Sequence, residues 1–234
     1  MAPAGKPRKW LRWTVAGVVA VLVIVVGAPF VYIHFIEPDP EKTPTLADTP
    51  TTALQAGETR TPLAGTWKIT NGSVVQYRVK EVLFGQDSTA TGSTKSITGS
   101  MKIAGTQVDT ASFSVDMTTV TSDKSVRDGQ FQGRIMDTAQ FPTATFELSN
   151  PIELGAEPKD GVKKTYPATG KLTLHGTAKD VTFQVIARRT ANLIAVQGNI
   201  PVTFTDYGID DPSGGPASVG NVGQLAFVLQ FAPS

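Results

Sequence analysis

Apolar and polar side chains alternate along short segments from residue 66 to the C-terminus. The pattern is clear in "GKLTLHGTAKDVTFQV", residues 170–185, where two alternating runs flank a short polar break. Successive side chains of a β-strand point to opposite faces, so this period of two is typical of strands that bury one face. Similar runs cover residues 75–79, 113–117 and 225–231. The chain must therefore fold by pairing many short strands.

Clusters of turn-forming residues separate these runs. "TNGS", "AGTQVD", "PKDG" and "DDPSGGP" combine Gly, Pro, Asn and Asp, which favour turns and loops. We predict about eight strands with hairpin-length connections in a domain of residues 66–234, arranged as an antiparallel barrel or sandwich. Because the chain has no cysteine, a hydrophobic core must hold this all-β domain together without disulfide bonds.

One segment, residues 122–142, interrupts the alternation. Phe131, Ile135 and Met136 follow a spacing closer to that of a helix, and Pro142 ends the segment. Two glycines within it favour a short or irregular helix over a long one. Because such a helix has an apolar face to bury, we expect it to lie on the barrel, across one open end.

The N-terminus carries a separate signal. Residues 1–13 are basic and residues 14–36 contain no Asp, Glu, Lys or Arg; about 20 apolar residues suffice to cross the hydrocarbon core of a membrane. Acidic residues follow, so the positive-inside rule predicts a single-pass anchor in the cell membrane, with residues 1–13 cytoplasmic and the C-terminal domain extracytoplasmic. The alternative is a cleaved signal peptide, whose apolar part would be only about 7–15 residues long.

Residues 37–65 differ in composition from the segments on either side. They are rich in Pro and Thr and hold almost no large apolar side chains. A segment of this kind buries too little surface to order itself, so we predict an extended linker between the anchor and the barrel.

The chain offers few side chains for catalysis, metal binding or nucleic acid recognition. It has two histidines and no cysteine, so we expect no metal site and no enzymatic activity. His175 is predicted to occupy a hairpin turn within residues 170–185; the alternative is a general base oriented by Asp206 or Asp180. The formal net charge of +1 argues against a nucleic acid partner.

Four stretches of the chain, in this order, resemble the YceI family of bacterial envelope proteins, and in particular its membrane-anchored actinobacterial members. They are "GTWKITNGSVVQYRVKEVLFG", "SVRDGQFQGRIMDTAQFPTATFELS", "ATGKLTLHGTAKDVTFQV" and "IPVTFTDYGI". The resemblance implies a lipocalin-like extended antiparallel barrel of about eight strands with a short helix near one end. It also implies that the interior binds a long isoprenoid, such as a polyprenyl phosphate or a quinone-type lipid; we expect no cofactor besides such a ligand.

Inward-facing apolar residues of the strands and the insert are the candidates for lining a lipid tunnel. They are Phe113, Val115, Met117, Phe131, Ile135, Met136, Phe146, Leu172, Leu174, Phe183, Phe204, Phe227 and Leu229. The alternative for each of them is that it simply fills the core. Lys124 and Arg127 are candidate contacts for a lipid headgroup, because Arg makes paired hydrogen bonds to phosphate oxygens.

Together these features predict a membrane-anchored, non-enzymatic lipid-binding barrel. Burial of an apolar chain provides about 0.8 kcal/mol per methylene, so a long isoprenoid needs no strong polar contact to be held. Such a protein would sequester, store or transfer its lipid. The alternatives are an envelope enzyme that acts on such a lipid with His175, and a fully packed barrel whose outer surface binds another protein.

Overall fold

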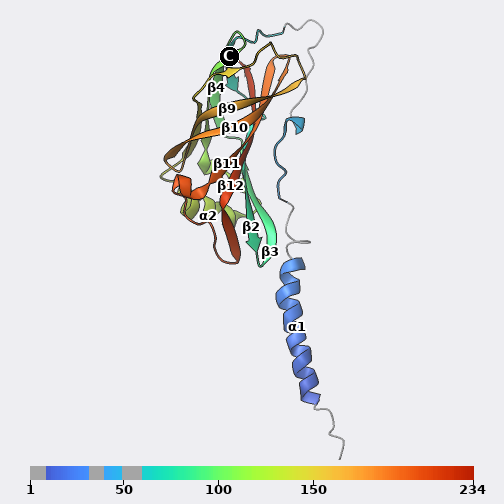
Figure 1. Ribbon diagram of the computed structural model, residues 1–234. Helices are drawn as coiled ribbons and strands as arrows, with labels where there is room; N and C mark the ends of the chain where they lie inside the picture. The colour runs from blue at the N-terminus through green and yellow to red at the C-terminus, as the bar shows by residue number, and fades with distance from the viewer. Residues whose placement is uncertain (1–8, 32–39, 49–59) are drawn as a thin grey trace, which may run out of the picture.

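Eight antiparallel strands close into a barrel in the computed structural model, which describes residues 9–31, 40–48 and 60–234 (Figure 1). In order around the ring they are β1 (Gly65–Ile69), β4 (Ile97–Ala104), β5 (Gln107–Asp116), β7 (Thr143–Leu148), β9 (Lys163–Leu174), β10 (Thr177–Thr190), β11 (Leu193–Thr203) and β12 (Ala217–Pro233). The ring closes because β1 pairs with both β4 and β12. The prediction of an all-β antiparallel barrel is confirmed.

A second group of strands lengthens the wall on one side. Strand β12 is 17 residues long; its C-terminal part pairs with β1, and the rest pairs with β2 (Val74–Leu83). Strand β3 (Gln86–Thr94) then pairs with β2, and the short β6 (Thr121–Ser122) pairs with β3. A further short strand, β8 (Ile152–Glu153), pairs with β5. The β2–β3 hairpin therefore prolongs the barrel beyond the eight-stranded ring.

The predicted alternation is visible in the burial of single strands. Along β9, Tyr166, Ala168, Leu172 and Leu174 are buried, whereas most of the residues between them are exposed or half-buried. The buried side chains of the ring strands form one continuous apolar cluster inside the barrel. The period-two pattern therefore identified the inward face correctly.

The segment that interrupts the alternation forms a short irregular helix, as predicted. Helix α2 (Ser125–Gln130) continues into a π-helical turn, η4 (Phe131–Ile135), in which the Met136 N–H donates to the Phe131 carbonyl over 2.9 Å. Phe131 and Met136 are buried. Figure 1 shows α2 at the same end of the barrel as the β2–β3 hairpin. Three short 3₁₀ turns complete the described elements: η2 (Leu46–Asp48), η3 (Met117–Thr119) and η5 (Phe204–Tyr207).

Residues 40–48, which we call the strap, lie against the outside of the barrel. Leu46 has no exposed surface and packs on Ala195 and Val228, and its N–H donates to the Gln197 side-chain oxygen over 2.9 Å. This part of the predicted linker 37–65 is therefore docked, because one leucine finds an apolar seat on the outer face of β11 and β12.

The strap runs antiparallel to β2. Its Lys42 carbonyl accepts a hydrogen bond from the Gln76 side chain over 3.1 Å. Towards its N-terminal end, the Glu41 carbonyl accepts one from Arg78, and the Glu41 N–H donates to the Thr91 hydroxyl. The chain thus approaches its dock from the side of the β2–β3 hairpin.

Residues 60–65, the last part of the predicted linker, contact the barrel. The Trp67 indole N–H donates to the Leu63 carbonyl over 2.9 Å, and both side chains are buried. Arg60 forms ion pairs of 3.0 Å with Glu157 and Asp160. These contacts attach the end of the predicted linker to the barrel.

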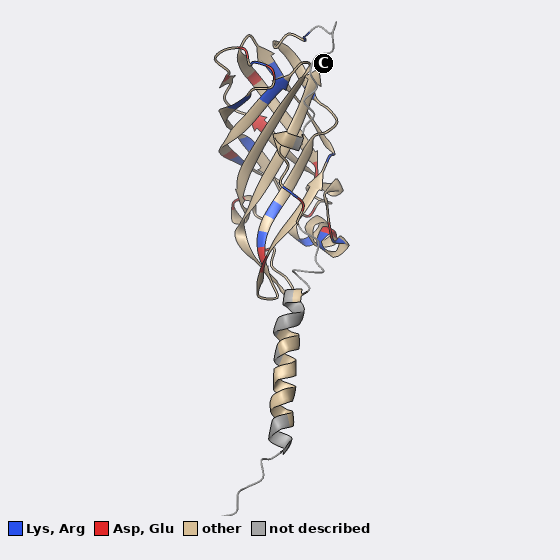
Figure 2. Cartoon of the chain, turned by 90° about the vertical axis from the view of Figure 1, so that its right-hand side faces the viewer, with Lys and Arg blue, Asp and Glu red and all other residues tan. Residues whose placement is uncertain are grey.

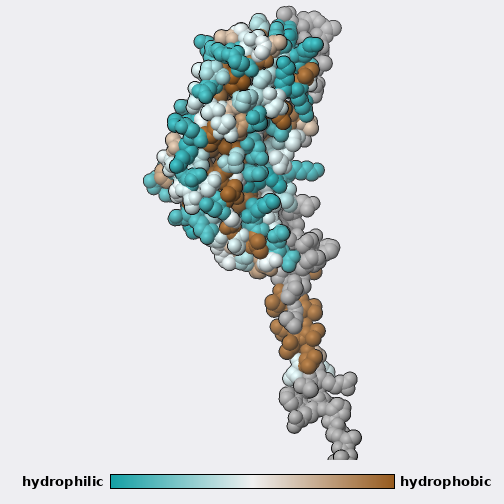
Figure 3. All heavy atoms as spheres, in the orientation of Figure 1, coloured by the Kyte–Doolittle hydropathy of each residue, from teal (hydrophilic) through white to brown (hydrophobic). Residues whose placement is uncertain are grey.

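Helix α1 (Lys9–Val31) contains part of the predicted membrane span. Its described side chains, which include Val15, Val18 and Ile24, are exposed, and Figure 3 shows them as a hydrophobic surface. No helix in the described ranges combines the length and hydropathy needed to cross a membrane. Residues 32–36 of the span lie outside the described residues. Membrane anchoring therefore stays a prediction from the sequence.

Removal of the strap's anchoring side chain tests whether the dock is stable. We expect Leu46→Ala to weaken docking by about 2 kcal/mol, because it removes apolar atoms from a fully buried site. Faster hydrogen exchange at the backbone amide of residue 46, which donates to Gln197, would report the change. Val162→Ala removes an exposed apolar side chain and should alter stability by no more than about 0.5 kcal/mol. Unchanged exchange in Leu46→Ala would contradict the docked position.

Candidate binding cavity

The end of the barrel next to α2 is hollow. A cavity of about 850 Å³ lies between β2, β12, the inner faces of the ring strands and the helical insert. Its volume falls within the range of about 300–1,000 Å³ that is usual for ligand sites. The alternative of a fully packed barrel is therefore wrong for this half of the domain.

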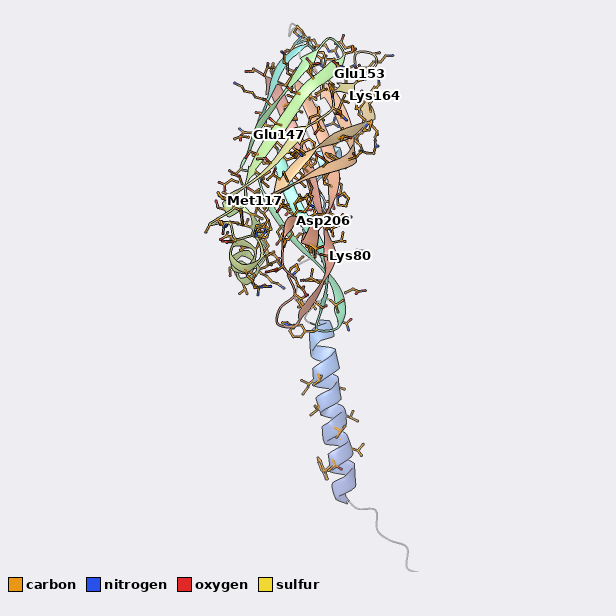
Figure 4. The ribbon with its side chains drawn as sticks, turned by 60° about the vertical axis from the view of Figure 1, so that its left-hand side comes forward. Lys80, Met117, Glu147, Glu153, Lys164 and Asp206 are labelled. Carbon is orange, nitrogen blue, oxygen red and sulfur yellow. The ribbon has the colours of Figure 1, made fainter. Side chains whose placement is uncertain are left out.

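Most of the predicted tunnel residues line this cavity. They are Phe113, Val115, Met117, Phe131, Ile135, Met136, Leu172, Leu174, Phe204 and Phe227, together with Lys124 and Arg127 at its rim. Figure 4 shows Met117 beside the helical insert, in the half of the barrel that also carries Lys80 and Asp206. The structure thus brings side chains from β5, the insert, β9 and β12 to one apolar wall.

Three predicted residues lie elsewhere. Phe146, Phe183 and Leu229 line a second, smaller cavity of about 110 Å³ instead. They point inward as expected, but their strands place them beyond the main hollow. Position along the barrel axis, which alternation does not encode, separates them from the main site.

The sequence analysis missed a wall supplied by β2 and β11. Val75, Tyr77 and Val79 from β2 and Ile200 and Val202 from β11 all line the main cavity. Alternation was the available signal, since 75–79 is one of the alternating runs. Assigning β2 to the site required its pairing with β12, which lies more than a hundred residues away in sequence.

The insert is fixed on the cavity by an aromatic stack. The rings of Tyr77 and Phe131 lie 5.1 Å apart and nearly parallel, at 9°. Tyr77 faces Gly92 across the β2–β3 pair, where a Cβ atom would lie 2.4 Å from the tyrosine ring. Burial raises the pKa of Tyr77 well above its usual range. The tyrosine therefore stays neutral and acts as part of an apolar wall.

Three charged side chains line the main cavity: Glu81, Lys124 and Arg127. Arg127 on α2 contacts Glu81 on β2 over 3.4 Å and also forms an ion pair with Asp123. Glu81 is buried and borders the cavity. Asp128 accepts hydrogen bonds from the Ser122 N–H and hydroxyl, which secures the start of the insert. Arg127 and Asp128 thus brace the helix, and Arg127 also brings a positive charge to the mouth.

The mouth also presents exposed apolar side chains. Phe84, at the tip of the β2–β3 hairpin, is 53% exposed and Val126 on α2 is 74% exposed; both line the cavity. The loop that contains "DPSGGP" borders the same opening, and Arg134 holds it by donating to the Asp211 and Pro212 carbonyls over 2.8 Å. An apolar ligand therefore meets exposed apolar side chains at the mouth before it reaches the interior.

Charge on the rest of the barrel is mixed. Figure 2 shows Lys and Arg interspersed with Asp and Glu along the strands. Glu153 and Lys164 lie at the end opposite the insert (Figure 4). A mixed surface of this kind does not favour one sign of ligand charge.

His175 occupies the two-residue turn between β9 and β10, as predicted. Its φ is 50°, one ring nitrogen lies 3.3 Å from the Tyr207 carbonyl, and its ring packs edge-on against Phe141 with centroids 4.6 Å apart. Asp180, a predicted partner, forms an ion pair with Lys171 instead. His175 lines neither of the two cavities described above. These contacts give His175 a role in fixing the hairpin.

Comparison with known proteins gives consistent results. A model of the YceI-like domain family matches residues 67–231. The chain is similar to the solved structure of a polyisoprenoid-binding domain from Saccharophagus degradans, implicated in plant cell wall breakdown, with 18% identity, a TM-score of 0.59, and coverage of 73% of this chain and 99% of that chain. The chain is also similar to the solved structure of BcnA from Burkholderia cenocepacia, with 22% identity, a TM-score of 0.53, and coverage of 68% of this chain and 95% of that chain. These structures share the fold. No curated protein matches the chain.

Substitution of His175 separates a structural role from a catalytic one. We expect His175→Ala to lower the free energy of unfolding by about 1–2 kcal/mol, because the hydrogen bond and ring contact are lost. His175→Asn should cost less, since Asn tolerates positive φ. Urea unfolding measures both. Full stability combined with loss of ligand binding in His175→Ala would contradict the structural role.

Proposed function

The chain belongs to the YceI-like domain family, and we propose that its barrel binds a long isoprenoid lipid in the main cavity. The observation that carries the proposal is the hollow itself, about 850 Å³ with walls built almost entirely from apolar side chains. The similar domain from Saccharophagus degradans is described as polyisoprenoid-binding, which supports the same class of ligand here.

The energetics of the cavity favour an extended apolar chain. Each buried methylene contributes about 0.8 kcal/mol, so several isoprene units are held without a strong polar contact. A charged metabolite would lose its hydration in the interior without gaining partners there. The site therefore selects for hydrocarbon and only weakly for its chemical identity.

The headgroup would remain at the mouth. Lys124 and Arg127 line the cavity, and with a polyprenyl phosphate they would supply the positive charge that phosphate oxygens require. Buried Glu81 contacts Arg127 and opposes a second anion. A quinone-type lipid has no charge and is not repelled by Glu81. The proposal therefore includes both a phosphate and a quinone headgroup.

The proposed role is sequestration, storage or transfer of the lipid without chemical change. The sequence of residues 14–36 supports a membrane tether with the barrel on the extracytoplasmic side, and the exposed apolar side chains of α1 agree with a helix that needs a partner. A tether would keep the barrel at high local concentration beside lipids of that membrane.

Blocking the cavity tests the proposed function. Leu225 on β12 lines the hollow and is only partly buried, so Leu225→Trp should fill space that the lipid needs. Native mass spectrometry of gently extracted full-length protein should show an isoprenoid on the wild type and at least tenfold lower occupancy in this variant. Val222→Trp, at an exposed position of the same strand, is the matched control and should retain the lipid. Lipid-free wild type, or equal occupancy in Leu225→Trp, would refute the proposal.

The rim charges predict a change in headgroup preference. Glu81→Gln removes a negative charge beside Arg127 at nearly constant volume, so it should raise the affinity for a polyprenyl phosphate relative to the free alcohol by about tenfold, or about 1.4 kcal/mol. The double variant Lys124→Gln/Arg127→Gln should shift this ratio the opposite way. Competition binding with matched phosphate and alcohol measures it. An unchanged ratio in both variants would remove these residues from the headgroup site.

A further inference from the structure

Four phenylalanine rings form a closed set of contacts across the inside of the barrel. Phe113 (β5), Phe146 (β7), Phe183 (β10) and Phe227 (β12) make up this set, which we call the phenyl tetrad. Centroid distances are 5.5 Å for Phe113–Phe146, 5.4 Å for Phe146–Phe183, 6.0 Å for Phe183–Phe227 and 5.5 Å for Phe113–Phe227. Each ring therefore contacts two others, and the contacts link four strands around the barrel.

The phenyl tetrad lies at the boundary between the two cavities. Phe113 and Phe227 border both the main cavity and the smaller one, whereas Phe146 and Phe183 border only the smaller one. Phe113 keeps part of its surface accessible, and the other three rings are buried. The rings thus form a partition between the two cavities, and Phe113 is the one ring of the four that is only partly buried.

Glycines on neighbouring strands hold two of the rings in place. Phe227 lies over its cross-strand partner Gly198, where a Cβ atom would be 2.3 Å from the ring. Phe146 on β7 lies over Gly170 on the neighbouring strand β9, with 2.4 Å between that Cβ position and the ring. Any larger residue beneath these rings would push them towards the middle of the barrel. The partition is therefore a defined packing arrangement.

We infer that the phenyl tetrad is the floor of the lipid site and sets the longest isoprenoid chain that can be fully buried. This inference rests on the proposed function. A chain that entered from the mouth would gain affinity with each methylene until its end reached Phe113 and Phe227. Carbon atoms beyond that point would stay at the mouth or fold back, and would add little.

The expected signature is a break in the dependence of affinity on chain length. A buried methylene contributes about 0.8 kcal/mol, or about fourfold in affinity. Affinity should therefore rise steeply through a series of linear isoprenoid alcohols and then stop rising at one length. Opening the partition would join the small cavity to the main one and move the break to longer chains.

The experiment uses purified full-length protein and displacement of a fluorescent hydrophobic probe by linear isoprenoid alcohols of increasing length. In the wild type, affinity stops rising at one chain length. In Phe113→Ala, the next longer alcohol should bind at least tenfold more tightly than the alcohol of that length. Phe113→Leu also removes the ring but keeps an apolar side chain, and it replaces Phe113→Ala in the test if the alanine variant does not fold. Phe113→Trp adds volume to the floor and should shorten the limit. Phe231→Ala is the matched control, because Phe231 borders only the smaller cavity, so its break should match that of the wild type.

Two results would overturn the inference. One is a break at the wild-type length in Phe113→Ala, Phe113→Leu and Phe113→Trp alike; the other is an equal shift in Phe231→Ala. Failure of every alcohol to displace the probe from wild-type protein is a different outcome. It would refute the proposed lipid site, and the length limit with it.

Discussion

The pairing of strand β12 along both of its edges is the interaction on which the rest of the molecule depends. One edge is occupied by β11, and the other is shared between β1 and β2. Pairing with β1 closes the ring, and pairing with β2 extends the wall past it. A register irregularity between Val219 and Gly223 falls within the extended part, where such bulges bend a strand. Without the part of β12 that pairs with β2, the ring would still close through β1, but the cavity would lose the wall that β2 supplies.

The closed ring and the extension have different interiors. Within the ring, opposing strands are close enough for aromatic side chains to meet, as the phenyl tetrad shows. Beyond it, β2 and the insert stand far enough from the opposite wall to leave a hollow. Tyr77 and Phe131 cover one side of this hollow by stacking on each other, so the insert acts as wall in place of a strand. The mouth is therefore built from elements of three kinds: a hairpin, a helix and a loop.

Much of this fold was predictable from sequence, because strand periodicity and turn chemistry are local. The alternation of apolar and polar residues predicted the inward faces of the strands, and the break in this alternation predicted the helical insert. The "LHG" sequence indicated the hairpin turn at His175. Alternation does not report how far along the barrel a residue lies, so Phe146 and Phe183 could not be separated from Phe113. The contribution of Val75 and Tyr77 depended on a long-range pairing. Leu46 was missed because its seat on Ala195 and Val228 exists only after the barrel has formed.

The direction of the strap determines where the polypeptide departs from the barrel. Going back from Leu46 through Lys42 to Glu41, the chain follows β2 towards the hairpin that carries Phe84. Eight residues separate Val31 from residue 40, which is a contour of about 30 Å at most. The docked Leu46 therefore limits the distance between α1 and the barrel, and it fixes the end of the barrel towards which residues 46 to 41 run. Were α1 embedded in a bilayer, the open end of the barrel would be the one turned towards it, and cargo would have little water to cross.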